Sequence, residues 1–579
     1  MATLAADKLS VAVQHHQVGS LERADRLYRQ VLARDPRNAD ALHLRGLLAA
    51  DTGQLELAVE LIRRAITIRP GSALFNLNLA RILMTNGRIA EAVECYQVAI
   101  SGAPSAELLN ELGSALQEIG RPDEALEYLQ KAIQLNPKLA VAHNALAVTL
   151  IAMNRVEEAL AASREAARLD NKAVHFHLNV AMTLRLLRRE EEAIVHVERA
   201  LALEPANADA LNSMGCALCA LDKASEATVY YRRAIAIDKK VADYHHNLGV
   251  ALQMLQRPEE AIAAYREALA RQDYHDTRIG LAMCQLMLGR LQEAWPGFDF
   301  RLQALFERGV RPTLPIWTGD AAEGRTLLVV AEHGFGDSLQ FCRYLPFVRQ
   351  RGFRVIVMAP NALLRLFRES FSDVQIQPYA EAVGDVYIPM MSLPRMFDTS
   401  LDTIPAQVYL HADPARVRAW RERLAPLQGL RAGLVWAGNA REKMNRRRSI
   451  APERLAPLFD VSGVSWFSLQ KTAPFAPPEF PLIDYMSEMT DFSDTAALVA
   501  NLDLVISVDS AMAHLAAGMG KPVWLLNRFD TCWRWLLERK DSPWYPTLRI
   551  YRQPAPGDWD SVLAAVQHDL GTLAAPRAA

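Results

Sequence analysis

The sequence predicts an α-solenoid followed by an α/β region of two Rossmann-like lobes. Through the first half of the 579 residues an alanine recurs with a period of about 34 residues, which is typical of a stacked helical repeat. In the second half short apolar, β-rich runs alternate with helical stretches, the pattern of parallel sheets covered by helices on both faces. A hydrophobic fraction of 51% with 22% charged residues indicates an ordered chain.

The repeat is marked at several positions of each unit. The alanine stands at Ala24, Ala58, Ala92, Ala125, Ala159, Ala193, Ala227, Ala261 and Ala294. Small residues at close helix contacts (Gly46, Ala80, Gly113, Ala147, Ala181, Gly215, Gly249, Ala282), turn glycines (Gly19, Gly53, Gly87, Gly120, Gly289) and terminal prolines (Pro36, Pro70, Pro104, Pro137, Pro205) keep the same period. Each unit is therefore predicted as helix, turn, helix.

Stretches such as LGVALQMLQRPEEAIAAYREAL (residues 248 to 269) closely resemble the tetratricopeptide repeat, and the resemblance covers residues 5 to 300 in about nine units. Stacked helix pairs of this kind coil into a superhelix with a long concave groove, which suits an extended peptide. An asparagine recurs in the first helix of most units, at Asn78, Asn110, Asn144, Asn179, Asn212 and Asn247. Two interpretations stay open: these amides bind a peptide backbone in the groove, or they bridge neighbouring repeats.

Charge and cysteine content narrow the class of protein. The 64 Lys and Arg residues against 66 Asp and Glu leave a net charge of −2, so no global basic field favours nucleic acid, and an anion site must be local. Six sparse cysteines fit a reducing compartment, and Cys216 and Cys219 are interpreted as helix-packing residues rather than zinc ligands. We find no membrane span and no secretory leader in the first 20 residues, and we expect a cytoplasmic protein.

Eight strands are predicted after the repeats, at residues 326 to 331, 354 to 359, 386 to 390, 432 to 438, 465 to 470, 502 to 509, 522 to 527 and 548 to 552. A helix and turn within residues 410 to 431 separate them into two sets. The predicted domains are a repeat superhelix (1 to 300), a linker (301 to 324), a short first lobe (325 to 428) and a second lobe (429 to 579). In such folds ligands bind beyond the carboxyl ends of the strands, so the loops there are the candidate site.

The first candidate loop runs from Glu332 through His333 to Asp337, after the first predicted strand. Its glycines, Gly334 and Gly336, allow a tight turn and a close approach to a ligand. Asp337 stands at the start of the following helix, where its carboxylate can take a proton from an attacking hydroxyl. The alternative is that Asp337 only caps that helix.

The second candidate loop, residues 438 to 449, contains Asn439 and the densest group of cations in the chain. Residues 441 to 448 hold five cations and one acid, and Arg448 closes the group. Guanidinium groups at a strand end suit phosphate oxygens, whereas a solvated basic loop or a nucleic-acid contact is the alternative.

The third candidate loop, from Asp509 to His514, joins a strand to a helix. The backbone N–H groups of Ser510, Ala511 and Met512 are predicted to face an anion with help from the helix dipole. His514, one turn later, can donate to the same phosphate or serve only in packing. Together, a carboxylate and loops that bind an anion suit transfer from a nucleotide-sugar. Gln470 and Lys471, after another strand, are candidates for contacts with the base and the sugar of that molecule.

Three segments resemble glycosyltransferase family 9, which contains the ADP-heptose:lipopolysaccharide heptosyltransferases, in its repeat-fused bacterial form. They are GFGDSLQF (334 to 341), RRRSI (446 to 450) and SVDSAMAHLAAGMGKPVWLL (507 to 526). The resemblance implies a metal-independent, inverting enzyme with a GT-B fold and a nucleotide-diphosphate sugar as donor. It also implies that Asp337 is the general base, that Arg448 replaces a phosphate-binding lysine, and that Asp509 to His514 bind the donor.

The first lobe departs from the family by its length of about 105 residues, which puts a lipopolysaccharide acceptor in doubt. Repeats before such a pair of lobes are similar in outline to the protein O-GlcNAc transferases. We therefore expect a protein or peptide acceptor guided by the repeat groove. The alternatives are a glycan-extending heptosyltransferase-like enzyme, a non-catalytic repeat scaffold, and a nucleic-acid binder, which the charge balance disfavours.

Overall fold

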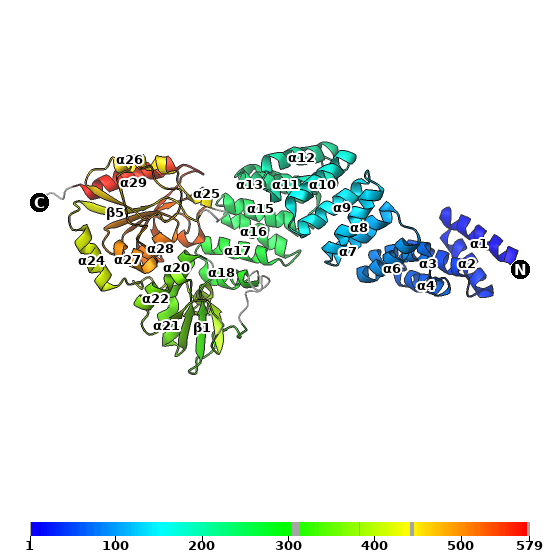
Figure 1. The fold of residues 1–579 in the computed structure, drawn as a ribbon, viewed down its shortest axis with the longest axis horizontal. Coiled ribbons are helices and arrows are strands. Elements are labelled where there is room, and N and C mark those ends of the chain that lie inside the picture. Colours follow the sequence, from blue (N-terminus) through cyan, green and yellow to red (C-terminus); the bar gives the residue numbers. More distant parts are fainter. Residues whose placement is uncertain (1, 304–312, 333, 381–382, 440–444, 576–579) are drawn as a thin grey trace. The chain divides into compact units, whose positions relative to one another are not determined.

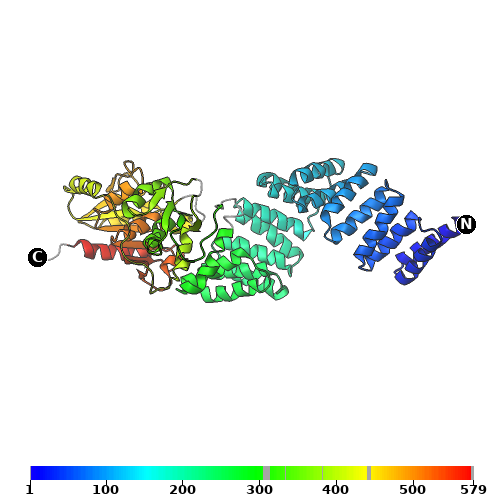
Figure 2. The same ribbon diagram turned by 90° about the horizontal axis from the view of Figure 1, so that it is seen from below.

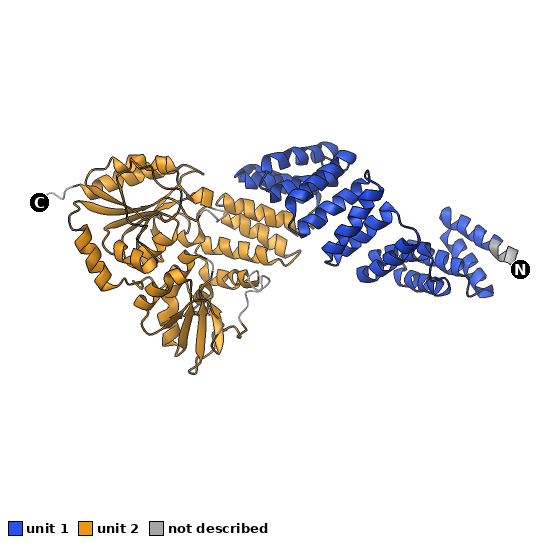
Figure 3. Ribbon diagram, in the orientation of Figure 1, with its two compact units in different colours: residues 1–239 blue, residues 240–579 orange. Residues whose placement is uncertain are grey.

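A computed structural model describes residues 2–303, 313–332, 334–380, 383–439 and 445–575 of the chain. The chain forms two compact units, residues 1–239 and 240–579 (Figure 3). The boundary between the units falls inside the repeat array, before its last four helices. Two parts of the candidate loops lie outside the described residues. They are His333 of the first loop and residues 440 to 444 of the second.

The first unit consists of helices that pair in order along the chain (Figure 2). Their bounds are α1 Ala2–Gln17, α2 Leu21–Arg34, α3 Ala39–Asp51, α4 Leu55–Ile68, α5 Ala73–Thr85, α6 Ile89–Gly102, α7 Ala106–Glu118, α8 Pro122–Leu135, α9 Ala140–Ala152, α10 Val156–Leu169, α11 Val174–Leu186, α12 Glu190–Leu203, α13 Ala208–Ala220 and α14 Ala224–Ile237. Each pair is one repeat, so the predicted helix, turn, helix arrangement is confirmed.

The glycines at the predicted close contacts have a steric reason. A Cβ on Gly113 would lie 2.6 Å from Leu129 Cγ, and one on Gly215 would lie 2.6 Å from Tyr231 Cε1. No real side chain tolerates such distances, because packed interiors have no room for an added methyl group. The small residue lets the second helix of a repeat place a bulky side chain against the first.

Two contacts made by asparagine side chains connect neighbouring repeats. Asn179 Nδ2 donates to Asn144 Oδ1 at 2.6 Å, and Asn78 Nδ2 lies 2.9 Å from His43 Nε2. At these positions the asparagine side chains bridge neighbouring repeats, as the second interpretation predicts.

The second unit begins with two further helix pairs, α15 Ala242–Met254 with α16 Pro258–Leu269 and α17 His275–Met287 with α18 Leu291–Phe298. The first lobe follows, with a four-stranded parallel sheet in the order β3-β2-β1-β4. Its elements are β1 Thr326–Val330, α20 Phe335–Phe341, α21 Leu345–Gln350, β2 Arg354–Met358, α22 Leu364–Ser370, β3 Gln375–Gln377, β4 Val386–Pro389 and α23 Leu393–Met396.

The second lobe has a seven-stranded sheet in the order β10-β11-β9-β8-β5-β6-β7. All neighbouring strands are parallel except the edge pair β10 and β11. Its elements are α24 Pro414–Leu424, β5 Leu430–Val435, α25 Asn445–Arg448, α26 Ala456–Phe459, β6 Val464–Ser468, β7 Leu482–Asp484, α27 Phe492–Val499, β8 Leu504–Val508, α28 Ala511–Gly518, β9 Val523–Asn527, β10 Asp541–Ser542, β11 Tyr545–Arg552 and α29 Trp559–Ala574. Figure 1 shows α26 and α29 on one face of this sheet and α27 and α28 on the other.

Each of the eight predicted strands corresponds to a strand of the structure, and the parallel sheets are confirmed. The strands β3, β7 and β10 were not predicted, because they have only two or three residues and carry polar side chains, as in the QIQ sequence of β3. Short strands of this kind give no apolar run.

One hydrophobic core runs from the last repeat helices through both lobes. Trp295 of α18 is 2% exposed, and its ring lies 5.9 Å from the ring of Trp533 in the second lobe. This shared core joins α17 and α18 to the lobes, and α16 packs in turn against α17. Within the described residues, we find no helix that combines the length and apolar character needed to cross a membrane.

Candidate active site between the two lobes

The first and third candidate loops meet where α20 packs against α28. A Cβ on Gly336 would lie 2.9 Å from His514 Cδ2 and 3.7 Å from Ala511 Cα. Only glycine allows so close an approach without a shift of the His514 ring. Gly336 therefore brings the carboxylate loop of the first lobe to the start of the helix that follows β8.

Both oxygens of Asp337 accept hydrogen bonds. Oδ2 accepts from the backbone N–H of Gly334 at 3.0 Å, and Oδ1 accepts from Nη2 of Arg534. Gly334 is the N-cap and Asp337 the third helical residue, so Asp337 caps α20 from one turn inside it. Its side chain keeps 23% of its exposure, and a carboxylate has about four lone-pair sites, so further acceptor capacity remains.

Arg534 was not identified from the sequence, although an arginine between two tryptophans (WRW, 533 to 535) is unusual in an apolar stretch. Its Nε donates to Gln340 Oε1 at 2.5 Å, and its guanidinium lies 4.6 Å from the ring centre of Trp533. Burial alone would lower the pKa of Arg534, but the charges of Asp337, Cys532 and Asp509 raise it above the ordinary value. A fixed cation thus orients the Asp337 carboxylate.

His514 is 4% exposed and stacks on Trp535 at 5.3 Å. Its Nδ1 lies 2.8 Å from the Tyr545 hydroxyl. The Tyr545 hydroxyl lies closer to His514 Nδ1 than to the Tyr409 hydroxyl, which is 3.4 Å away, so we assign the Tyr545 hydrogen to Nδ1 and the ring hydrogen to Nε2. Nε2 makes no hydrogen bond to the part of the chain that the structure describes, and it is available as a donor.

Burial lowers the pKa of His514 well below 6.5, and the charges of Arg534 and Arg343 lower it further. Below pH 6.5 the unfolded chain binds a proton at this site and the folded chain does not, so stability falls as the pH decreases. We expect the urea midpoint of the second unit to decrease when the pH is lowered from 7.5 to 5.5. The decrease should be smaller in His514→Gln. All ten tryptophans lie in residues 240–579, so tryptophan fluorescence reports this unit alone. Equal pH dependence in both proteins would contradict the assignment.

Arg448 lies against the end of β5. A Cβ on Gly438 would be 2.5 Å from its Nε, and Nε donates to Asn445 Oδ1 at 3.4 Å. The neighbouring Arg447 donates to Asp530 Oδ2 at 2.9 Å, which ties this loop to the turn after β9. The predicted cations at 441 and 443 lie outside the described residues.

A cavity of about 420 Å³ opens at the carboxyl ends of β5, β6 and β8. Of the predicted site residues Asn439, Gln470, Ser510, Ala511 and Met512 line it, whereas Gly336, Asp337, Arg448, Asp509 and His514 do not. Its other lining residues are Phe335, Ala362, Val435, Ala437, Gly438, Leu469, Lys471, Thr472, Met486, Met489, Thr490, Asp491, Phe492 and Thr495. Its lining is mostly apolar, with a few polar groups, as in sites for planar organic ligands.

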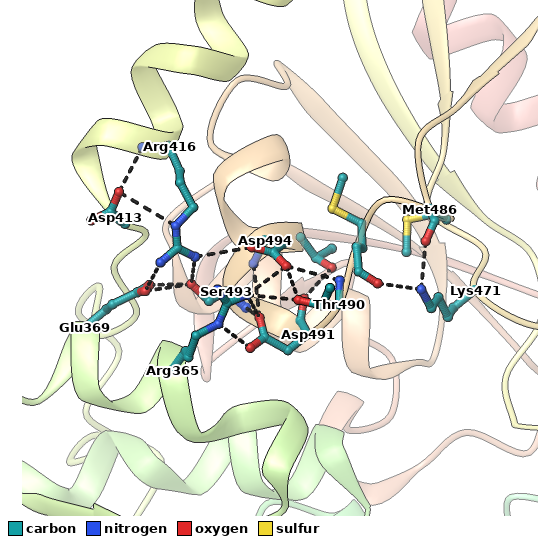
Figure 4. Close-up of polar contacts among 12 residues, drawn as sticks. Arg365, Glu369, Asp413, Arg416, Lys471, Met486, Thr490, Asp491, Ser493 and Asp494 are labelled. Carbon is teal, nitrogen blue, oxygen red and sulfur yellow. Dashed lines mark hydrogen bonds and ion pairs between the residues drawn. The ribbon is translucent and has the colours of Figure 1, made fainter.

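Gln470 and Lys471 hold the wall of this cavity. Gln470 is 3% exposed; its Oε1 accepts from the backbone N–H of Ala437 at 3.1 Å, and its Nε2 donates to Thr472 O at 2.9 Å. Lys471 Nζ donates to the carbonyls of Met486 at 2.7 Å and Met489 at 2.6 Å (Figure 4). Both side chains are engaged with backbone groups, so their clearest role is to shape the cavity.

A network of ion pairs joins the lobes beside the cavity (Figure 4). Arg365 of α22 donates to Asp491 Oδ1 at 2.7 Å, and Arg416 of α24 donates to Glu369 at 2.9 Å and to Ser493 Oγ at 2.6 Å. Asp491 caps α27 through its contacts to the N–H groups of Ser493 and Asp494. The first lobe is thereby attached to the segment that forms one side of the cavity.

The start of α28 presents free donors. Within the described residues the N–H groups of Ser510, Ala511 and Met512 donate no hydrogen bond, as expected for the first positions of a helix. Asp509, just before them, contributes charge near Arg534. No group of three His, Cys, Asp or Glu side chains is arranged to hold a metal ion in the described ranges.

Comparisons with protein families agree with this architecture. Tetratricopeptide-repeat models match residues 17–73, 49–112, 106–139, 207–246 and 242–275. The model of glycosyltransferase family 9 (heptosyltransferase) matches residues 487–526, which include β8, α28 and one side of the cavity. The predicted resemblance to tetratricopeptide repeats is confirmed, and the resemblance to family 9 is confirmed for the segment at 507 to 526, whereas the segments at 334 to 341 and 446 to 450 lie outside the match. The chain contains tetratricopeptide repeats, and its second lobe contains a segment similar to glycosyltransferase family 9.

Two curated relatives share part of this organisation. Protein FlbA of Caulobacter vibrioides is 28% identical over 331 residues, which are 50% of this chain and 54% of FlbA. The probable UDP-N-acetylglucosamine–peptide N-acetylglucosaminyltransferase SPINDLY of Hordeum vulgare is 27% identical over 130 residues, 21% of this chain and 14% of SPINDLY. The chain therefore matches about half of one relative's length and a small part of the other's.

Similar solved structures are repeat proteins. A tetratricopeptide-repeat protein from Parabacteroides merdae is 17% identical, covers 43% of this chain and 98% of its own, and has a TM-score of 0.39. YrrB, described as a TPR protein with an unusual peptide-binding site, is 20% identical, covers 32% of this chain and 95% of its own, and has a TM-score of 0.29.

Proposed function

We propose that the protein is an inverting, metal-independent glycosyltransferase of the GT-B type, which moves a sugar from a nucleotide-diphosphate sugar to a protein or peptide acceptor guided by the repeats. The observation that carries this proposal is the contact of α20 with α28. The helix that carries the partly exposed carboxylate of Asp337 packs against the helix whose first residues have free N–H groups and line the apolar cavity.

In the proposed reaction Asp337 takes the proton of the acceptor hydroxyl or amide. The acceptor atom then bonds to the sugar carbon as the bond from that carbon to the diphosphate oxygen breaks. The negative charge that develops on the diphosphate is stabilised by Arg448, by the N–H groups of residues 510 to 512 and by His514 Nε2–H. A neutral His514 can donate here only as the Nε2 tautomer, which Tyr545 selects.

The cavity suits the nucleoside part of the donor. Leu469, Met486, Met489 and Phe492 provide apolar walls for a base, while Asn439 and the start of α28 provide polar groups. Thermal unfolding of the full chain with UDP, GDP, ADP and CMP, alone and as sugar conjugates, tests this site. We expect one nucleotide to raise Tm, because a ligand that binds only the folded state stabilises it. If no nucleotide raises Tm, a non-catalytic repeat scaffold is favoured.

The acceptor follows from the repeats and the relatives. SPINDLY, which is similar to 21% of this chain, is named for transfer to peptide. Six cysteines without disulfides (Cys95, Cys216, Cys219, Cys284, Cys342, Cys532) fit the proposed cytoplasmic location. The family 9 match supports a second candidate function, transfer of the sugar to a glycan or lipopolysaccharide.

Cell lysate with labelled nucleotide-sugars, with and without the enzyme, distinguishes the acceptors. We expect enzyme-dependent label in acid-precipitated protein that protease releases. Label that extracts with lipid instead would favour the glycan-extending enzyme.

A further inference from the structure

The last repeat pair is connected to the candidate base by two separate sets of contacts. One set runs from Arg301, just after α18, to the loop that carries Asp337. The other runs from Trp295 and Phe298 of α18 to Arg534, the partner of Asp337. Both start within ten residues of each other, in a part of the chain that the sequence predicted as repeat and linker.

The first set is a buried polar cluster. Arg301 is 7% exposed, and its Nη2 donates to Glu332 Oε1 at 2.6 Å and to Ser392 Oγ at 3.0 Å. The same Glu332 oxygen accepts from the backbone N–H of Met391 at 3.1 Å. Nη1 of Arg301 donates to Asp299 Oδ1 at 2.8 Å. Glu332 stands at the end of β1, five residues before Asp337, so the ion pair anchors the base of the carboxylate loop.

The second set is aromatic. The rings of Trp295 and Phe298 lie 5.9 and 5.8 Å from the ring of Trp533, in edge-to-face geometry. The guanidinium of Arg534 lies 4.6 Å from the ring centre of Trp533, and Arg534 donates a hydrogen bond to Asp337. Trp295 is itself held by a hydrogen bond from Nε1 to Thr399 O at 2.8 Å.

We propose that the last repeat pair is part of the catalytic unit, with Arg301 and Trp295 as positioning residues for Asp337. The proposal rests on the proposed role of Asp337. Arg301 sets the start of the loop through Glu332, and Trp295 sets the direction of the carboxylate through Trp533 and Arg534. Such buried contacts hold a carboxylate in one geometry, and a displacement of about 1 Å costs up to roughly 100-fold in rate. The repeats thus help to build the site to which they are proposed to guide an acceptor.

The test compares Arg301→Gln, Arg301→Lys and Trp295→Leu in the full chain with Arg395→Gln. Arg395 is the matched control, because it binds the other oxygen of Asp299 (Oδ2, 3.0 Å) with a side chain that is 47% exposed, whereas Arg301 is buried. We expect kcat to fall roughly 10- to 100-fold in Arg301→Gln and Trp295→Leu while KM for the donor stays unchanged. Arg301→Lys should recover part of kcat, and Arg395→Gln should resemble the wild type.

Hydrogen exchange provides a readout that does not need a known donor. In Arg301→Gln we expect faster exchange in residues 334 to 341, and in Trp295→Leu in residues 532 to 541, with unchanged exchange in β8 and β9. Uniformly faster exchange across the second unit, or a kcat and exchange pattern equal to that of Arg395→Gln, would overturn the proposal. If the wild type transfers no sugar, the proposed function fails, and the exchange pattern still decides whether α18 positions this loop.

Discussion

Asp337→Asn is expected to abolish sugar transfer while nucleotide binding stays intact. The amide keeps the size of the side chain but cannot accept a proton at neutral pH, and general bases contribute about 10²- to 10⁴-fold to rate. The measurement is release of nucleoside diphosphate, together with the Kd of the nucleotide that raises Tm. Asp373→Asn is a suitable control, because Asp373 pairs with Arg349 at the surface, with a side chain that is 61% exposed.

Loss of the charge also leaves Arg534 without its carboxylate, so the rate must be separated from stability. Asp337→Glu retains the charge but moves the carboxylate oxygens by one methylene. We expect this variant to retain most of the Tm of the wild type and to lose most of its turnover. If Asp337→Asn turns over at the rate of the wild type, Asp337 is not the base and its capping contact with Gly334 is its whole function.

Trp533→Ala is expected to lower the free energy of unfolding of the second unit by about 3–5 kcal/mol, the usual range for a buried aromatic replaced by alanine. Trp533 is 1% exposed, and its ring contacts those of Trp295, Phe298 and Trp544. Its removal leaves a cavity between the repeat helices and the second lobe. Urea denaturation followed by tryptophan fluorescence measures this unit alone.

Phe475→Ala is the matched control, because this ring is 65% exposed and its loss should change stability by less than about 0.5 kcal/mol. A loss in Trp533→Ala as small as in the control would mean that α18 and the second lobe do not share a core.

Periodicity explains how much of the fold could be predicted. The repeats follow from a 34-residue period that fixes both the turn and the close-contact position. Where the turn glycine is missing, its positive φ is taken, at 55° to 65°, by Asn154, Arg188, Asp222 and Gln256. The buried strands follow from their apolar runs. The division of the chain before α15 could not be predicted, because it depends on the packing of Trp295 against Trp533, 238 positions later.

The site was predictable where it depends on strand ends and not where it depends on packing. Asp337, Ser510 and His514 lie in the segments that follow β1 and β8, at the carboxyl ends of the strands, where such folds bind ligands. Gln470 also follows a strand, but only coordinates reveal that its amide is bound to the backbone of Ala437 and Thr472. Arg534 lies 197 positions after Asp337 in the turn between β9 and β10, and the local sequence carries no sign of that pairing.

Photolabelling tests the central claim most directly, namely that a nucleotide diphosphate occupies the cavity beside Asp337. The full chain is irradiated with azido derivatives of UDP, ADP and GDP, and the modified peptides are sequenced. We predict label in the segments that contribute to the cavity lining, namely residues 435 to 439, 469 to 495 or 510 to 512, or at Phe335 or Ala362, and loss of label when the unmodified nucleotide is added in excess. Label confined to other segments, or label that excess nucleotide leaves unchanged, would contradict the account.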